Sequence, residues 1–399
     1  MKSLTKKFIP PFLLSWYHFK LAFLGALIYR FPSRKLKVIG VTGTNGKSTT
    51  VEFITKIFEE AGIPVASQSS IRFKIKDKEW LNTYKMTMPG RFFIQKFLRQ
   101  AADAGCKYAV IEVTSEGIKQ YRHKFINFDT AVFTNLAPEH IESHGSFENY
   151  KIAKGKLFQA TKNIHIINID DKNSDYFLKF PAKKTYTYGL SKGNINYQNT
   201  NFKLQLLGDF NIYNALAAIC VGVSRGIGMD ICKRAVEKIT GIPGRMEMVI
   251  SEPFKVFVDY AFTPNALEKV YSGIKKDFNP QEMICVLGAC GGGRDKWKRP
   301  ILGQLAAKYC QKIIITNEDP YDENPEKIIQ DVALGAGGKA KTISDRREAI
   351  KEALKIARPN DAVILTGKGC EPWICLAGGK KMAWDEKKVV KEEFNNLQR

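Results

Sequence analysis

The chain has 399 residues and a mass of 45.0 kDa, which is enough for two or three domains with cores of ordinary size. Hydrophobic residues make up 44% and charged residues 26%, without low-complexity runs, so the composition excludes a largely disordered or fibrous protein. The net charge of +22 favours an anionic partner such as a nucleotide, a nucleic acid or a membrane surface.

An apolar and basic segment, residues 1–36, precedes the first predicted strand. Residues 8–31 are apolar apart from His18, Lys20, Arg30 and a few hydroxyls, and no acidic residue occurs before Glu52. Two prolines and the lysine weaken a transmembrane helix. Two interpretations stay open: an interfacial helix under an anionic membrane leaflet, and a helix packed on the next domain.

From residue 37 onward, short β-branched runs alternate with stretches of helical period. The runs are VIGVT, YAVIEV, TAVFTNL and IHIINID. This alternation predicts a parallel sheet with helices on both faces. Residues 71–84 and 197–207 alternate polar and apolar side chains, so we expect a hairpin at each of these places.

A connection marked by glycine and proline, GIPGRME at 241–247, is followed by a second strand–helix series: KVFVDY, EMICVLGAC, KIIITN and DAVILTGKG. The predicted fold class is therefore α/β with two domains. Residues 37–243 would form a central domain with a parallel sheet of the P-loop ATPase type. Residues 244–399 would form a smaller, Rossmann-like α/β domain.

The cysteines indicate the cellular compartment, and the distribution of charge indicates the class of partner. The eight cysteines include no C-x-x-C pair and the sequence shows no cleavable signal, so we expect reduced core thiols and a cytoplasmic catalytic body. Beyond the N-terminal segment, basic residues are spread out rather than clustered with aromatic residues. This distribution argues against a nucleic-acid partner.

The sequence VIGVTGTNGKSTT at 38–50 has the strand, glycine-rich turn and helix of a phosphate-binding loop, although Val41 replaces the first glycine of G-x-x-x-x-G-K-[ST]. In such a loop, backbone N–H groups approach a polyphosphate, the lysine reaches the β and γ phosphates, and the serine hydroxyl binds Mg²⁺. Glu112 ends a strand of the buried type and is predicted to hold Mg²⁺ beside the phosphates. The residues predicted to bind ATP here are Gly43, Thr44, Asn45, Gly46, Lys47, Ser48 and Thr49.

The form T-G-T-N-G-K-S-T resembles the ATP loop of the Mur ligase family, which also includes folylpolyglutamate synthases. Further blocks look like the MurE type, the UDP-N-acetylmuramyl-tripeptide synthetases: EVTSEGIKQYR, TNLAPEHIESHG, ENYKIAKGKLF, NIYNALAA, GIPGRME, VDYAFTPNALE, GGGRDKWKRP and GKGCE. The resemblance covers about residues 38–390. It implies a monomeric, ATP- and Mg²⁺-dependent ligase that joins an amino acid to a muramyl-peptide precursor of peptidoglycan through an acyl phosphate.

The resemblance also implies roles for single residues around the nucleotide. Lys154 matches the lysine that the family carbamylates, and its carbamate would ligate a second Mg²⁺ together with His140. From the residues alone, Lys154 would be one of several exposed lysines. Asn214 could equally be a residue that caps or bridges helices. The positions that match ATP contacts are Asn211, Asn214, Arg245 and, near the ribose, Asp259.

Other matches concern the two substrates to be joined. The positions that hold the muramyl peptide in MurE-type enzymes are Thr87, Thr114, Gln120 and Arg122, and those expected to read the incoming amino acid are Glu318, Asp319 and Glu371. Enzymes that add diaminopimelate show D-N-P-R where this chain has E-D-P-Y. The lost arginine and the added acid favour a lysine-like or other diamino acid. Family histidines are replaced by Glu116, Phe262 and Cys370.

MurE-type enzymes carry a uridine-nucleotide-binding domain before the ATP loop, and the 36 residues found here cannot hold it. We therefore expect either that other surfaces bind the nucleotide or that the acceptor is a lipid-linked muropeptide, reached by an enzyme peripheral to the inner face of the membrane. The alternatives left open are a MurT-like or other family ligase, disfavoured as MurT-like by the lack of a C-x-x-C pair, and a catalytically inactive scaffold.

Overall fold

The computed structural model describes residues 10–398 and divides into two compact units. Within the described residues, unit 1 comprises residues 10–136, 148–203 and 212–238, and unit 2 comprises residues 137–147, 204–211 and 239–398. The first nine residues of the predicted N-terminal segment lie outside the described part. Both units contain a mainly parallel sheet with helices, which confirms the predicted α/β fold class.

Unit 1 is built on a nine-stranded sheet in the order β4-β3-β2-β5-β1-β6-β7-β8-β9. Strand β1 lies between β5 and β6 and runs parallel to both. Strands β3 and β4 add an antiparallel hairpin at one edge, which confirms the hairpin predicted for residues 71–84. The strands are β1 (Lys37–Thr42), β2 (Val65–Gln68), β3 (Arg72–Ile75), β4 (Lys78–Leu81), β5 (Tyr108–Glu112), β6 (Phe128–Phe133), β7 (Ile164–Asn168), β8 (Lys184–Gly189) and β9 (Ile195–Asn196).

The second hairpin, predicted for residues 197–207, is wrong. Residues Tyr197–Thr200 form the short helix α8, because the Asn196 side chain accepts a hydrogen bond from the Asn199 N–H and caps the helix. The other helices of this part of the chain are α1 (Pro11–Ile28), η2 (Pro32–Lys35), α2 (Lys47–Glu60), α3 (Arg91–Asp103), α4 (Ser115–Lys119), α6 (Phe147–Ala160), α7 (Ser174–Leu178), α9 (Phe210–Ser224) and α10 (Met229–Glu237).

Unit 2 contains a six-stranded sheet in the order β10-β11-β15-β12-β13-β14, parallel except for the pair β10 and β11. Its strands are β10 (Glu247–Ile250), β11 (Lys255–Val258), β12 (Met283–Leu287), β13 (Lys312–Ile315), β14 (Ala340–Thr342) and β15 (Ala362–Leu365). The remaining elements are α5 (Ile141–His144), α11 (Pro264–Phe278), α12 (Lys298–Tyr309), α13 (Pro325–Gly335), α14 (Arg346–Ile356), β16 (Trp373–Cys375), η3 (Ala377–Gly379), β17 (Lys381–Ala383) and α15 (Glu386–Leu397).

The side chains of the unit 2 strands alternate between two hydrophobic cores. Cys285 and Leu287 pack with α11, α12 and α13 on one face of the sheet, whereas Ile284 and Val286 pack with α14 and α15 on the other. This alternation follows from the two-residue period of a strand. A sheet buried on both faces explains why the strands read as continuous apolar runs in the sequence.

Two short segments of unit 2 come from within the range that the sequence assigned to the central domain. The side chain of Asp295 accepts hydrogen bonds from the backbone N–H groups of Ile141 (3.2 Å) and Glu142 (3.0 Å). Asp209 pairs with Lys276 of α11 at 2.6 Å. These contacts attach both segments to unit 2, although their neighbours along the chain belong to unit 1.

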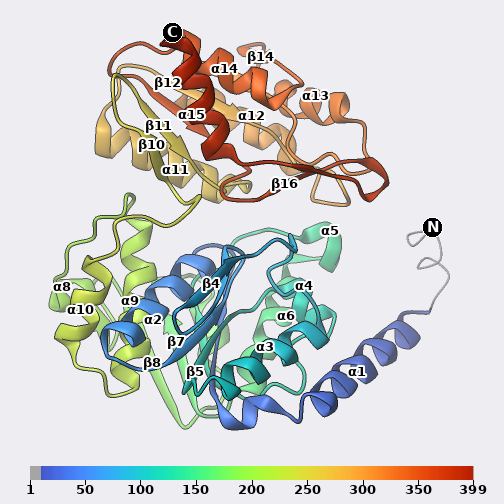
Figure 1. Ribbon diagram of the computed structural model, residues 1–399, viewed down its shortest axis with the longest axis vertical. Coiled ribbons are helices and arrows are strands. Elements are labelled where there is room, and N and C mark those ends of the chain that lie inside the picture. The colour runs from blue at the N-terminus through green and yellow to red at the C-terminus, as the bar shows by residue number, and fades with distance from the viewer. Residues whose placement is uncertain (1–9, 399) are drawn as a thin grey trace. The chain divides into compact units, whose positions relative to one another are not determined.

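Helix α1 packs on α3 at the outside of unit 1, as Figure 1 shows. The side chains of Ala22 and Ala26 are buried, and the Cα of Gly25 faces the backbone of Phe92 in α3. Within residues 10–398, none of the helices combines the length and the apolarity needed to cross a bilayer.

A buried ion pair in unit 2 yields a test of the fold. Arg346 and Glu386 are fully buried, and the guanidinium also donates to the Thr366 carbonyl at 2.9 Å. Replacing Arg346 with Met leaves a buried carboxylate without its cation, so we expect the free energy of unfolding to fall by about 3 to 5 kcal/mol in urea titrations. The adjacent Arg347→Met is the control, since Arg347 is half exposed in its ion pairs and should cost less than about 1 kcal/mol. Equal losses in both variants would contradict this account.

Candidate active site

The predicted phosphate loop lies at the carboxyl end of β1 and leads into α2. Gly43 and Gly46 both have positive φ angles, of 155° and 81°. A Cβ at Gly43 would lie 1.9 Å from Thr134 Oγ1, and one at Gly46 would lie 2.2 Å from Asn214 Oδ1. Neither position can therefore hold a side chain, and the loop backbone lies directly on its neighbours.

Two residues that the sequence analysis did not single out hold this loop from the end of β6. Asn135 accepts the Thr44 N–H on its carbonyl (2.8 Å) and the Asn45 N–H on its side chain (2.9 Å). Thr134 donates its hydroxyl to the Asn45 carbonyl at 2.7 Å. Both residues lie at the end of the predicted strand run TAVFTNL and open the block TNLAPEHIESHG, but the sequence alone did not show that β6 pairs with β1 beside the loop.

Ser48 and Glu112, both predicted to hold Mg²⁺, are in direct contact. The Ser48 hydroxyl donates to Glu112 Oε2 at 2.8 Å, and the backbone N–H of Ser70 donates to the same oxygen at 2.8 Å. Lys47 Nζ lies 3.9 Å from the other carboxylate oxygen. Glu112 is buried, and these contacts fix its carboxylate beside the start of α2.

The environment of Lys154 is not that of a surface lysine. The residue is 1% exposed, and its Nζ donates to the Gly43 carbonyl at 2.6 Å. The ammonium also lies 4.6 Å from the centre of the Tyr150 ring. Burial, and then the positive charge of Lys47, lower the pKa of Lys154 well below its usual value. The neutral, unprotonated amine of Lys154 is therefore more highly populated than that of an exposed lysine.

The predicted nucleotide contacts divide between the two units. Asn214 lies in unit 1, buried behind the phosphate loop, where its Oδ1 is 3.4 Å from the Thr50 hydroxyl. Asn211, at the start of the same helix, groups with unit 2 and donates to the Leu207 carbonyl at 2.7 Å. Asn214 thus contacts α2, the bridging role that the residues alone left open.

The four residues predicted to hold the muramyl peptide all lie in unit 1. Thr114 caps α4 by accepting the Gly117 N–H at 3.0 Å, and Arg122 donates to the Gln120 side chain at 2.8 Å. The backbone carbonyl of Thr87 accepts a hydrogen bond from the Gln68 side chain. Burial, and then the charge of Arg91, lower the pKa of Arg122.

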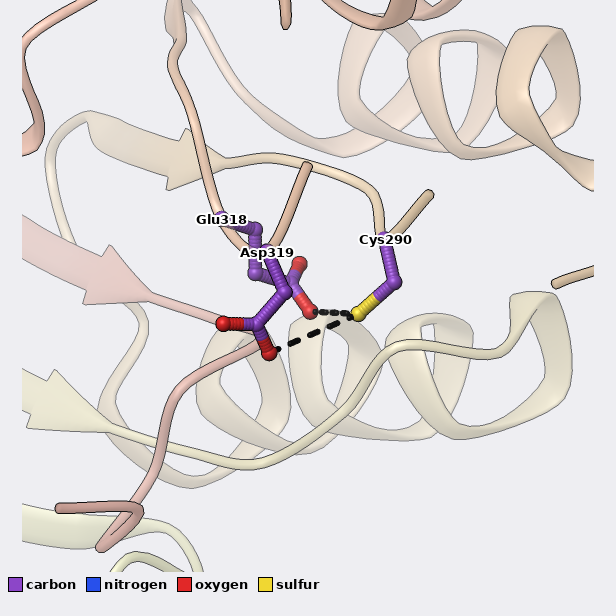
Figure 2. A group of neighbouring side chains, drawn as sticks. All are labelled: Cys290, Glu318 and Asp319. Atoms are coloured by element: carbon purple, nitrogen blue, oxygen red, sulfur yellow. Dashed lines mark hydrogen bonds between the residues drawn. The ribbon is translucent and has the colours of Figure 1, made fainter. Parts of the chain in front are cut away.

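In unit 2, two of the residues predicted to bind the incoming amino acid form a buried cluster with a thiol. Figure 2 shows that Glu318 and Asp319 point toward Cys290, whose sulfur lies 2.8 Å from Glu318 Oε1 and 3.9 Å from Asp319 Oδ2. Burial, and then the charge of Asp319, raise the pKa of Glu318. Burial also raises the pKa of the Cys290 thiol well above its usual value, so the sulfur is a hydrogen-bond donor to the carboxylate.

The sequence analysis did not single out Lys368, which is fully buried at the centre of this cluster. Its Nζ donates to Asp319 Oδ1 (3.0 Å), Glu371 Oε2 (3.1 Å) and the Trp373 carbonyl (2.7 Å). Tyr260 donates to the other oxygen of Glu371 at 3.0 Å. Lys368 therefore neutralises Asp319, whereas Glu318 Oε2 has no hydrogen-bond partner among the described residues.

The remaining predicted residues belong to unit 2. Asp259 accepts the backbone N–H groups of Met246 and Ala261, each at 2.6 Å, and its burial raises its pKa. Arg245 lies 4.5 Å from the centre of the Tyr260 ring. His140 is half-buried with a φ of 57° and precedes α5. Since Lys154 lies in unit 1, its predicted pairing with His140 stays a prediction.

The two oxygen-rich clusters differ in the cation that they suit. Ser48 and Glu112 offer a hydroxyl and a carboxylate next to the phosphate loop, the hard oxygen donors that Mg²⁺ prefers. The cluster of Cys290, Glu318 and Asp319 instead contains a thiol and already holds the ammonium of Lys368. The first cluster therefore fits the predicted Mg²⁺, and the second suits an amine.

Models of known protein families match both parts of the chain. Residues 41–222 match the Mur ligase middle domain and residues 244–369 the Mur ligase glutamate ligase domain. A UDP-N-acetylmuramyl-tripeptide synthetase from Roseiflexus sp. (strain RS-1) is 35% identical over 410 residues, covering 92% of this chain and 80% of that protein.

Solved structures share the fold. A UDP-N-acetylmuramoyl-L-alanyl-D-glutamate–2,6-diaminopimelate ligase has a TM-score of 0.59 at 28% identity, covering 91% of this chain and 79% of that one. The folylpolyglutamate synthase of Mycobacterium tuberculosis, solved with ADP and AMPPCP, has a TM-score of 0.71 at 16% identity and covers 90% and 96%. The two domain matches, and the relative that is 35% identical over 92% of this chain, show that the chain belongs to the Mur ligase family of ATP-dependent amide-bond-forming ligases.

Proposed function

We propose that this ligase adds an amino acid to a muramyl-peptide precursor of peptidoglycan. The observation that carries the proposal is the convergence of Ser48, Glu112 and Lys154 on the phosphate loop. The relatives named for muramyl-peptide synthesis support the substrate class. We place the activity in the cytoplasm, with contact to the inner face of the membrane through the N-terminal segment.

The chemistry follows from what the reaction must stabilise. A carboxylate of the acceptor takes the γ-phosphoryl group of ATP, and the amine of the incoming amino acid then displaces phosphate from the acyl phosphate. Negative charge develops on phosphoryl oxygens, and Lys47 with the loop N–H groups would neutralise it. Ser48 and Glu112 would hold Mg²⁺, which supplies further neutralisation when bound. Asn211, Asn214, Arg245 and Asp259 are proposed to contact the nucleotide.

We further propose that Lys154 reacts with CO₂. Its neutral amine attacks the carbon and loses a proton, which leaves a carbamate anion. The lowered pKa of Lys154 favours this reaction because only the unprotonated amine is a nucleophile. The carbamate would give the site a second anionic ligand, and we propose His140 as its partner on a second Mg²⁺.

The amino acid would be read in unit 2. Because Lys368 already neutralises Asp319, the buried Glu318 oxygen that has no hydrogen-bond partner among the described residues is the better partner for the ammonium of a diamino acid. Burial strengthens such a pair. Glu371, held by Lys368 and Tyr260, is proposed to orient the same substrate.

Product analysis tests the proposed function. The pure protein is incubated with ATP, Mg²⁺, UDP-MurNAc-L-Ala-D-Glu and a pool of lysine, ornithine and diaminopimelate, and products are identified by mass spectrometry. We expect a new adduct that requires ATP and contains a diamino acid. A product formed with the lipid-linked acceptor and not with the soluble one would show that the enzyme uses a lipid-linked muramyl peptide instead of a UDP-linked one. The absence of any product with both acceptors would refute the ligase assignment in favour of an inactive scaffold.

Lys154→Ala tests the carbamate. We expect turnover to fall on the order of 100-fold, because the second Mg²⁺ would lose its anionic ligand and the charge on the transferring phosphoryl group would be neutralised less well. Isotope-labelled bicarbonate should give a carbamate signal in the wild type that the variant lacks. Lys156→Ala is the matched control, because Lys156 is exposed on the same helix and should leave rate and signal unchanged. Full activity of Lys154→Ala together with the absence of a wild-type carbamate signal would contradict the proposal.

Glu318→Gln tests the choice of amino acid. Removing the charge should lower kcat/KM for a diamino acid about 10- to 100-fold, because one charge-assisted hydrogen bond is lost, while ATP affinity stays unchanged. Asp322→Asn serves as the control, since Asp322 is an exposed acid four residues away that accepts the Gly378 N–H. Equal kcat/KM for wild type and Glu318→Gln would show that this carboxylate does not read the substrate.

A further inference from the structure

Helix α1 exposes far more apolar surface than any other helix described. Eight of the twenty exposed large hydrophobic side chains among the described residues lie in its 18 residues. Trp16, Tyr17 and Ile28 are 58%, 54% and 56% exposed. An apolar surface concentrated in this way marks a site of interaction with a partner or a membrane.

Six of the eight exposed side chains share one face of the helix, whereas the rings of Phe19 and Phe23 contact Phe125. The spacing of the six by three and four residues places them on a single stripe, the outer face of α1: Leu13, Trp16, Tyr17, Leu24, Leu27 and Ile28. Ala22, Gly25 and Ala26 lie on the opposite side and are buried. An ordinary surface helix has a polar outer face, whereas α1 is apolar on both sides, so its outer face lacks the usual solvent-facing residues.

The charges around the outer face indicate an anionic occupant. Lys20 falls in the middle of the stripe, and its Nζ lies 3.6 Å from the centre of the Trp16 ring. No acidic residue occurs before Glu52. The exposed basic residues that follow the helix are Arg30, Arg34, Lys35 and Lys37. Tryptophan, tyrosine and a lysine with its ammonium at the edge of an apolar face are the residues enriched where proteins meet lipid headgroups.

A second copy of the chain fits this face less well. A two-fold contact would place the same patch on both sides, so the positive charge of Lys20 and of the basic residues after the helix would be present on both partners. Like charges brought together in an interface disfavour association. An anionic bilayer surface accepts both the apolar stripe and the basic flank.

The inner side of α1 is attached to the segment that carries two acceptor residues. Ser15 Oγ lies 2.7 Å from the Tyr121 hydroxyl, and the Phe19 ring packs edge-on against Phe125. Arg91 hydrogen-bonds His18 of α1 and donates to the Gln120 carbonyl at 3.0 Å. The helix is therefore joined directly to the turn between Gln120 and Arg122.

We propose that the outer face of α1 docks on an anionic lipid bilayer and holds the acceptor-binding segment at its surface. The helix lies in the interface rather than across it, in keeping with its length and composition. This inference rests on the proposed function for the role of Gln120 and Arg122, and it identifies the partner of the same site as a lipid surface.

Vesicle sedimentation of the full chain tests the proposal. Vesicles of phosphatidylcholine are compared with vesicles that also contain phosphatidylglycerol. We expect the wild type to sediment with the anionic vesicles and less so as salt is raised. The double variant Leu24→Gln/Leu27→Gln should bind at least about tenfold more weakly, because two leucines no longer enter the apolar layer and the net charge is unchanged.

The matched control is Leu334→Gln/Leu397→Gln, which replaces two exposed leucines of α13 and α15. Its vesicle binding should equal that of the wild type, and both variants should keep the wild-type thermal unfolding. Equal binding to neutral and anionic vesicles would overturn the proposal. So would binding that Leu24→Gln/Leu27→Gln leaves intact, or a lipid-free dimer that this variant converts to a monomer.

Docking and catalysis can fail separately. Leu24→Gln/Leu27→Gln should retain wild-type ligase activity on any soluble acceptor that the wild type uses, because the outer face lies away from the attached segment. If the wild type forms no product on any acceptor yet binds anionic vesicles through α1, the proposed function fails and the docking surface stands. If it forms product but never binds vesicles, the docking proposal fails alone.

Discussion

The hydrogen bonds that converge on Glu112 are the interaction on which the rest of the unit 1 site depends. One carboxylate oxygen accepts the Ser48 hydroxyl from the start of α2 and the Ser70 N–H from the loop after β2. Since β1, β5 and β6 are parallel neighbours, the phosphate loop, this carboxylate and Asn135 meet at one edge of the sheet. The order of the strands thus decides which polar groups can surround a nucleotide.

The sequence predicted what depends on neighbouring residues and missed what depends on the order of the strands. The phosphate loop and the runs of apolar residues in the strands were recognisable, because glycine spacing and periodicity are local properties. The contact of Asn135 with the loop was not, since it requires β6 to lie beside β1. The hairpin expected at 197–207 failed for a local reason, the capping of α8 by Asn196, which alternation of polar and apolar residues does not reveal.

In unit 2, pairing with a buried lysine distinguishes two acids that look alike in the sequence. Asp319 is bound by Lys368 and by the Cys375 N–H, whereas Glu318 accepts a hydrogen bond from the thiol of Cys290 and its other, buried oxygen has no hydrogen-bond partner among the described residues. The sequence shows the charges of both acids but not which one a buried cation neutralises. Under the proposed function, the choice between the two acids as partner of a cationic substrate would depend on Lys368, which the motif-based analysis did not single out.

The affinity for ATP with and without Mg²⁺, measured by calorimetry on the wild type and on Glu112→Gln, tests the central claim most directly. Glu112 and Ser48 should make nucleotide binding Mg²⁺-dependent in the wild type. The amide should remove most of that dependence while leaving Mg²⁺-free binding nearly unchanged, because Gln keeps the shape and loses the charge. ATP binding that shows the same Mg²⁺ dependence in both proteins, or no ATP binding by the wild type, would contradict the account.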